Sequence, residues 1–134
     1  MDRKYKLLQD EKLSCIIYKK EQVYTAKTSG IKPIMEFLEE GILENACVVD
    51  KVIGKAAAML MVYGQVKEIY TPLISTPALS LLQQNNIPVT YEKEVPYIIN
   101  RKKDGMCIME KAVLNCNNVK EAYHILKEKL EHLS

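Results

Sequence analysis

The sequence lacks any apolar run long enough to cross a membrane. A helix that spans a bilayer needs about 20 consecutive apolar residues, and the best candidate here covers only Ala56–Tyr63. The N-terminus is charged and no apolar region follows it, so a secretory signal is also missing. We therefore expect a cytoplasmic protein that does not enter a membrane.

The sequence also lacks closely spaced metal ligands. Its four cysteines form no C-x-x-C pair, and its two histidines, His124 and His132, both fall near the C-terminus. A chain of this size does not need disulfides to fold, so free thiols are expected. Cys15 and Cys47 lie in apolar runs and are interpreted as small core residues.

No excess of one charge is present. The chain has 19 basic and 17 acidic residues, and its net charge is +2. Such a balance gives no strong field for nucleic acid or anionic lipid. The eight tyrosines are spread along the chain and do not form a base-stacking platform.

What the sequence does contain is enough material for one core. Its length of 134 residues suits a single domain, and 48% of the residues are hydrophobic. We find no repeat, linker or low-complexity tract. We therefore expect one domain over residues 1–134.

Periodicity and capping signals predict alternating helices and strands. Asp50 and Ser75 are predicted N-caps, and the helix after Asp50 is apolar on nearly all faces. The strand, helix and strand around Ser75 should form a right-handed parallel crossover. In chain order, we expect a helix over Asp2–Asp10, strands over Leu13–Tyr18 and Gln22–Lys27, a helix from Ser29 to Glu40, a short apolar run over Ala46–Val49, a buried helix over Asp50–Tyr63, a strand over Val66–Ile74, a helix from Ser75 to Asn86, strands over Pro88–Tyr91 and Tyr97–Asn100, a helix over Cys107–Leu114 and a closing helix capped by Asn117 or Asn118.

Two stretches carry a family resemblance: VVDKVIGKAAA at residues 48–58 and NRKKDGMCIMEKAV at residues 100–113. With the order of elements, they resemble a small bacterial family of unknown function within the cytidine deaminase-like superfamily. The resemblance implies an α/β fold of three α-β-α layers, with a mixed sheet that starts with a β-hairpin. It also implies that the N-termini of two helices meet over the sheet. It implies no established activity.

The zinc motif of that superfamily is missing. Zinc deaminases use H-x-E or C-x-E at the first helix start and P-C-x-x-C at the second, which together supply three metal ligands and a proton-shuttling glutamate. This chain has Asp50-Lys51-Val52 at the first place and the run from Ser75 to Leu79, STPAL, at the second. We therefore expect no zinc deaminase, no bound metal and no cofactor.

The first candidate site consists of Asp50, Lys51, Gly54 and Lys55. Free N–H groups and the positive end of the helix dipole favour an anion at a helix N-terminus. Lys51 and Lys55 would share one helical face, and Gly54 would allow a ligand or backbone to approach closely. The alternative is a capped helix with exposed lysines and a tightly packed glycine.

Ser75 and Thr76 could donate hydrogen bonds to a ligand at the second helix start. Helix capping alone would also explain both residues.

A further cluster contains Asn100, Arg101, Cys107 and Glu110. Arg101 could bind a phosphate or carboxylate, Cys107 could be a reactive thiol near a helix start, and Glu110 could act as an acid or base. The alternative is a turn with Glu110 on the surface of a helix.

Three functions remain open. The first is binding of a nucleotide-like or other anionic small molecule over the two helix starts. The second is an enzyme of non-zinc chemistry that uses Asp50, Lys51 or Cys107. The third is an interaction module that forms homo-oligomers.

Overall fold

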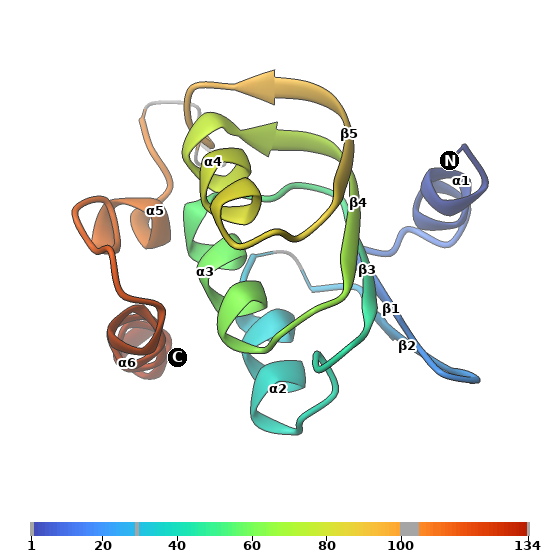
Figure 1. The fold of residues 1–134 in the computed structure, drawn as a ribbon, viewed down its shortest axis with the longest axis horizontal. Helices are drawn as coiled ribbons and strands as arrows, with labels where there is room; N and C mark the ends of the chain where they lie inside the picture. Colours follow the sequence, from blue (N-terminus) through green and yellow to red (C-terminus); the bar gives the residue numbers. More distant parts are fainter. Residues whose placement is uncertain (1, 29, 100–104, 134) are drawn as a thin grey trace.

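The computed structural model describes residues 2–28, 30–99 and 105–133 (Figure 1). Its elements follow the order predicted for most of the chain. They are α1 (Asp2–Asp10), β1 (Cys15–Lys19), β2 (Gln22–Ala26), α2 (Lys32–Glu39), β3 (Cys47–Asp50), α3 (Lys55–Tyr63), β4 (Glu68–Ser75), α4 (Thr76–Gln84), β5 (Val89–Val95), α5 (Ile108–Ala112) and α6 (Val119–Leu133).

The five strands form one mixed sheet in the order β2-β1-β3-β4-β5. Strand β1 is antiparallel to β2 and to β3, whereas β3, β4 and β5 are parallel to one another. Parallel neighbours need a crossover connection, and α3 and α4 supply the two crossovers. The predicted hairpin and the predicted parallel unit around α4 are therefore confirmed.

The helices are distributed unequally over the two faces of the sheet (Figure 1). Helices α2, α3 and α4 cover one face, α1 lies on the other, and α5 and α6 lie outside α3. The large core lies between the sheet, α2, α3, α4 and α6. A small second core beneath α1 contains Leu8, Leu13, Ile16 and Val49.

Helix α3 is the centre of the large core. Its residues Ala56 to Met61 are all buried, since the sheet, α2, α4 and α6 surround them. The prediction of a helix apolar on nearly all faces is confirmed. The helix also ends at Tyr63, as predicted. Gly64 follows it at a tightly packed place, since a Cβ on this glycine would meet the Cβ of Leu43 at 2.8 Å.

The predicted start of this helix, at Asp50, is wrong. Asp50 is the last residue of β3, and α3 begins at Lys55. The segment between them continues the sheet, because the Ile53 N–H donates to the Leu73 C=O at 2.9 Å and the Ser75 N–H donates to the Ile53 C=O at 3.0 Å. Residues 50–53, which local capping signals assigned to a helix, therefore belong to the sheet or extend it.

Other boundaries also differ from the predicted ones. Helix α2 begins at Lys32 with Ile31 at its N-cap, and Ser29, the predicted cap, lies outside the described residues. Strand β5 extends to Val95 because it pairs with β4 over its whole length. The strand predicted over Tyr97–Asn100 is reduced, within the described residues, to a bridge between Ile99 and Met106.

Several local predictions agree with the structure. Asn118 caps α6, since its Oδ1 accepts a hydrogen bond from the Glu121 N–H at 2.9 Å. The four cysteines are free, and Cys15 lies in the core. No helix in the described part of the chain has the length and hydropathy needed to span a membrane.

Candidate functional site

The starts of α3 and α4 are neighbours at the carboxyl ends of β3 and β4. A parallel bridge joins Ile53 and Ile74, which lie just before the two helices, and the helices pack against each other. The two helix starts singled out in the sequence are therefore brought together.

The start of α3 already holds a carboxylate, which Glu110 of α5 provides. The Lys55 N–H donates to Glu110 Oε1 and the Ala56 N–H donates to Glu110 Oε2, each at 2.7 Å. Glu110 is buried, with 7% of its surface exposed. Charged acceptors make strong hydrogen bonds, and a negative charge is favourable at the positive end of a helix dipole. Glu110, and not Asp50, therefore caps α3.

Gly54 is explained by the same contact. A Cβ built on this glycine would overlap both carboxylate oxygens of Glu110. Its φ of −101° is open to any residue, so the requirement is for space and not for backbone conformation. The group that approaches Gly54 is neither a ligand nor a backbone but a side chain of the protein itself, which agrees with the alternative of a tightly packed glycine. The expectation that Glu110 lies on a helix surface is wrong, because its carboxylate points into α3.

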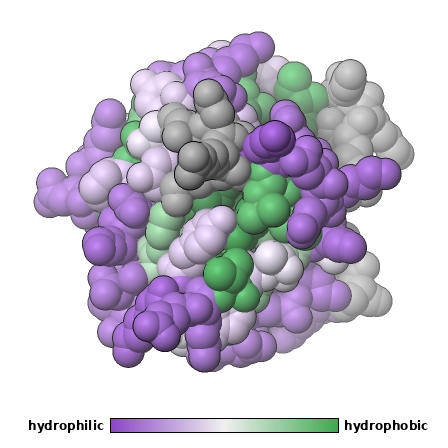
Figure 2. All heavy atoms as spheres, turned by 90° about the vertical axis from the view of Figure 1, so that its right-hand side faces the viewer, coloured by the Kyte–Doolittle hydropathy of each residue, from purple (hydrophilic) through white to green (hydrophobic). Residues whose placement is uncertain are grey.

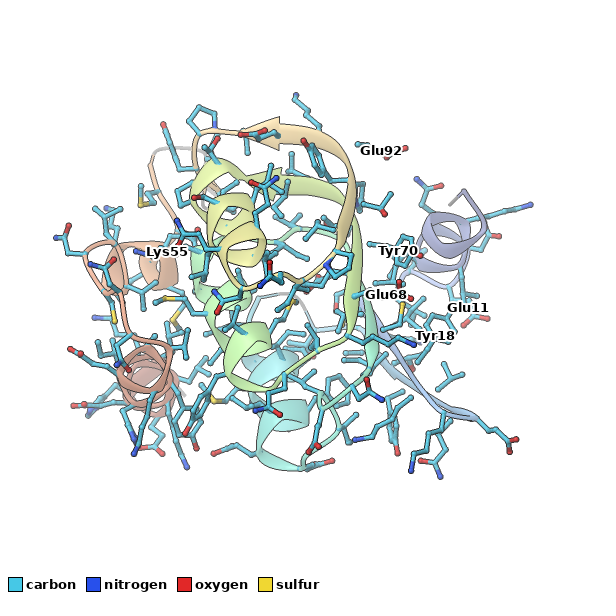
Figure 3. The ribbon with its side chains drawn as sticks, viewed as in Figure 1. Glu11, Tyr18, Lys55, Glu68, Tyr70 and Glu92 are labelled. Carbon is cyan, nitrogen blue, oxygen red and sulfur yellow. The ribbon has the colours of Figure 1, made fainter. Side chains whose placement is uncertain are left out.

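The two lysines of the first cluster do not share a helical face. Lys51 is exposed in the segment that follows β3, and only Lys55 belongs to α3. Lys55 lies on the side of α3 that faces α5 (Figure 3), and its Nζ donates to the Leu114 C=O at 2.9 Å. The prediction that Lys51 and Lys55 share a helical face is therefore wrong, because the helix starts four residues later than its local signals indicate.

The start of α4 is also capped from within. Ser75 is fully buried, and its Oγ accepts a hydrogen bond from the Ala78 N–H at 3.2 Å. Thr76 Oγ1 donates to Glu94 Oε2 at 2.8 Å and lies 3.3 Å from the Val95 C=O. Ser75 thus has the predicted capping role, and Thr76 ties α4 to the end of β5.

Asp50 is a buried carboxyl group at the carboxyl end of β3, opposite Cys15 of β1. Burial raises the pKa of Asp50 from 3.8 to about 7, although hydrogen bonds from the N–H groups of Val52 and Lys51 oppose the shift. Burial, together with the Asp50 charge, raises the pKa of the Cys15 thiol well above its usual value. Asp50 is therefore a group that can gain or lose a proton near neutral pH.

The remaining predicted site residues lie apart or cannot be placed. Cys107 is half-buried just before α5, and its N–H donates to the Ile98 C=O at 3.0 Å. Asn100 and Arg101 lie outside the described residues. Among the described side chains, no group of three or more His, Cys, Asp or Glu could hold a metal ion.

Sequence reasoning missed a polar cluster on the α1 face of the sheet (Figure 3). The register places Tyr18, Cys47 and Glu68 in one row across β1, β3 and β4. The Glu68 carboxylate, which also accepts a hydrogen bond from the phenol, is the main cause that raises the pKa of Tyr70. On the same side of the molecule, hydrophobic side chains gather near the middle of the surface and hydrophilic ones surround them (Figure 2). Strand alternation was the available signal, but only the pairing register brings these residues together.

The chain is similar to proteins of one family. A family model described as "TM1506: Domain of unknown function (DUF1893)" matches residues 3–130. A crystal structure of a DUF1893 family protein (TM1506) from Thermotoga maritima shares 29% sequence identity with the chain, has a TM-score of 0.87, and matches over 96% of this chain and 88% of that one. No curated protein matches. The expected resemblance to a family of unknown function is confirmed.

The contact between Gly54 and Glu110 predicts non-additive mutations. Gly54→Ala should destabilise the protein by about 1–3 kcal/mol, because its Cβ displaces the carboxylate. Glu110→Ala should cost a similar amount by leaving two N–H groups without their acceptor. In the double mutant Gly54→Ala should cost little more, since the overlap is gone. Urea unfolding measures these costs, and Gly105→Ala is the control because no atom lies within 4 Å of its added Cβ. Fully additive costs would contradict the contact.

Asp50 predicts a pH-dependent stability. Its pKa is about 7 in the folded protein and 3.8 for the ordinary carboxyl group of an unfolded chain, so the folded state binds the proton more tightly between these pH values. The free energy of unfolding should therefore fall as the pH rises from about 4 to about 7, by a few kcal/mol at about 1.4 kcal/mol per pKa unit. Asp50→Asn cannot ionise and should lose this slope. Urea unfolding at a series of pH values tests it, and an equal slope in both proteins would refute the assignment.

Proposed function

The chain belongs to the DUF1893 family, and we propose that it binds an anionic small molecule at the start of α3, in exchange with the Glu110 carboxylate. The observation that carries the proposal is that two consecutive backbone N–H groups hold a carboxylate there, each at 2.7 Å. Donors arranged for one carboxylate also suit another carboxylate or a phosphate. Gly54 provides the space above them.

The elements and charges around this contact favour an exchange of Glu110 for a ligand. Glu110 comes from α5, a helix of only five residues, whereas its two donors belong to α3, the helix at the centre of the large core. Lys51 is exposed near the same edge, and Lys55 can turn from the Leu114 C=O to a ligand. A nucleotide-like ligand would place its phosphate at the two N–H groups and replace the charge of Glu110.

As part of the same proposal, the fold is of the cytidine deaminase-like type without zinc. Three features support this: an N-terminal β-hairpin in the sheet, three parallel strands after it, and the adjacent starts of α3 and α4. Ser75-Thr76-Pro77 offers no thiolate at the second helix start. The free cysteines suit a reducing cytoplasm.

Asp50 favours a second candidate function, an enzyme that transfers a proton without zinc. A buried carboxyl group with a pKa of about 7 is suited to act as a general acid or base at neutral pH. It lies at the carboxyl end of β3, four residues before Gly54. If the anion-binding protein is also an enzyme, Asp50→Asn should keep ligand affinity and remove turnover.

Calorimetric titration with inorganic phosphate, acetate and AMP tests the binding function. The wild-type protein should bind at least one of them, and Glu110→Ala should bind the same anion about tenfold or more tightly because no internal carboxylate competes. Glu39→Ala is the matched control, since it removes an exposed carboxylate on α2 that pairs with Lys127. The proposal fails if neither the wild-type protein nor the Glu110→Ala protein binds any of these anions.

A further inference from the structure

The two edges of the sheet differ in their protection. Strand β5 forms one edge and carries Glu92, Lys93 and Glu94 in its middle, and charged residues of this kind discourage pairing with another strand. Strand β2 forms the other edge, and its sequence, QVYTA, contains no charge. The β2 edge is therefore the one that lacks this protection.

The free hydrogen-bonding groups of β2 belong to alternate residues. A two-residue turn, Lys20-Glu21, joins β1 and β2, so Lys19 and Gln22 form a hydrogen-bonded pair at its base. By alternation, Tyr24 and Ala26 also bond toward β1, in keeping with the Ala26 C=O accepting from the Ser14 N–H at 2.8 Å. Val23 and Thr25 then direct their N–H and C=O groups away from the sheet.

The side chains along this edge are exposed. Val23 has 56% of its surface exposed, which is the largest fraction among the exposed large hydrophobic residues described. Thr25 is exposed too, as are Glu21 and Lys27 at the two ends of the strand. On the opposite face of the sheet, Tyr24 packs against Phe37 of α2 with ring centroids 6.2 Å apart. The edge thus presents an uncharged centre between an acidic and a basic end.

We propose that β2 pairs with β2 of a second copy of this chain, antiparallel and about a twofold axis at Tyr24, to form one continuous sheet. In this register Val23 lies opposite Thr25 of the other copy, and each such pair covers an exposed valine. Glu21 lies opposite Lys27, so two ion pairs of opposite charge close the ends of the interface. The twofold axis makes every contact away from the axis occur twice.

The charges select this register over its neighbours. In an antiparallel pair about a twofold axis the strands shift in steps of two residues, because opposite residues share a face. Centring the axis on Val23 would place Glu21 opposite Thr25 and leave Lys27 beyond the end of the other β2, without an acidic partner. Centring it on Thr25 would place Val23 opposite Lys27 and separate Glu21 from that lysine. Only the Tyr24 register joins the acidic end of one strand to the basic end of the other.

Analytical ultracentrifugation of charge-reversed proteins tests the pairing. The wild-type chain should form dimers as its concentration rises from micromolar to near-millimolar. Glu21→Lys or Lys27→Glu alone should weaken the dimer by about tenfold or more, since both symmetric pairs become repulsive. The double reversal should restore it. Val23→Lys, which places a charge at the centre of the edge, should also weaken it, and Lys93→Glu on β5 should leave it unchanged.

Three results would overturn the proposal. One is a monomer at every concentration. Another is a dimer that neither the single reversals nor Val23→Lys weakens, which would place the interface elsewhere. The third is a double reversal that fails to restore the dimer weakened by each single change, which would exclude this register. Circular dichroism of each variant confirms that it is folded. Because Glu110 takes no part in these contacts, the outcome is independent of the proposed anion binding.

Discussion

The hydrogen bonds from the start of α3 to the Glu110 carboxylate connect the central buried helix to α5. Helix α3 is buried on nearly all sides, and the first N–H groups of a helix have no partner within it. Asp50 cannot serve them, because it ends β3 and accepts hydrogen bonds from its own segment. A carboxylate from α5 serves them instead, and Gly54 leaves room for it. The contact fixes α5 against α3. The Lys55 ammonium group, which donates a hydrogen bond to the Leu114 C=O just after α5, adds to this attachment.

This constraint shapes what the domain can do. Both helix starts at the carboxyl edge of the sheet are satisfied by the protein's own groups, Glu110 at α3 and Ser75 at α4. An anion can use the first site only in competition with Glu110, so binding there would release α5 from α3. Asp50 differs, since its proton equilibrium lies near neutral pH. Strand β2 lies at one edge of the sheet, and β4 and β5, which α4 connects, lie toward the other edge. Assembly and ligand binding would therefore use separate surfaces.

Local signals in the sequence were sufficient where neighbours along the chain decide the structure. The bounds of α1, the Ser75 cap, the end of α3 before Gly64 and a cap of α6 at Asn117 or Asn118 could all be predicted. The role of Asp50 could not be predicted, because this residue has the local signal of an N-cap but pairs in the sheet as the last residue of β3. The Glu110 contact could not either, since it joins groups 54 and 55 residues apart. Gly54 was the local trace of it, as a glycine that would allow another group to approach closely.

Amide hydrogen exchange at Lys55 and Ala56 measures the central contact most directly. Neither N–H has a partner within α3, and the Glu110 carboxylate is the acceptor that protects both. We expect slow exchange at both amides in the wild-type protein and fast exchange at both in Glu110→Ala, while the amides from Met59 to Tyr63 stay protected in each. Fast exchange at Lys55 and Ala56 in the wild-type protein, or protection that survives Glu110→Ala, would contradict the account.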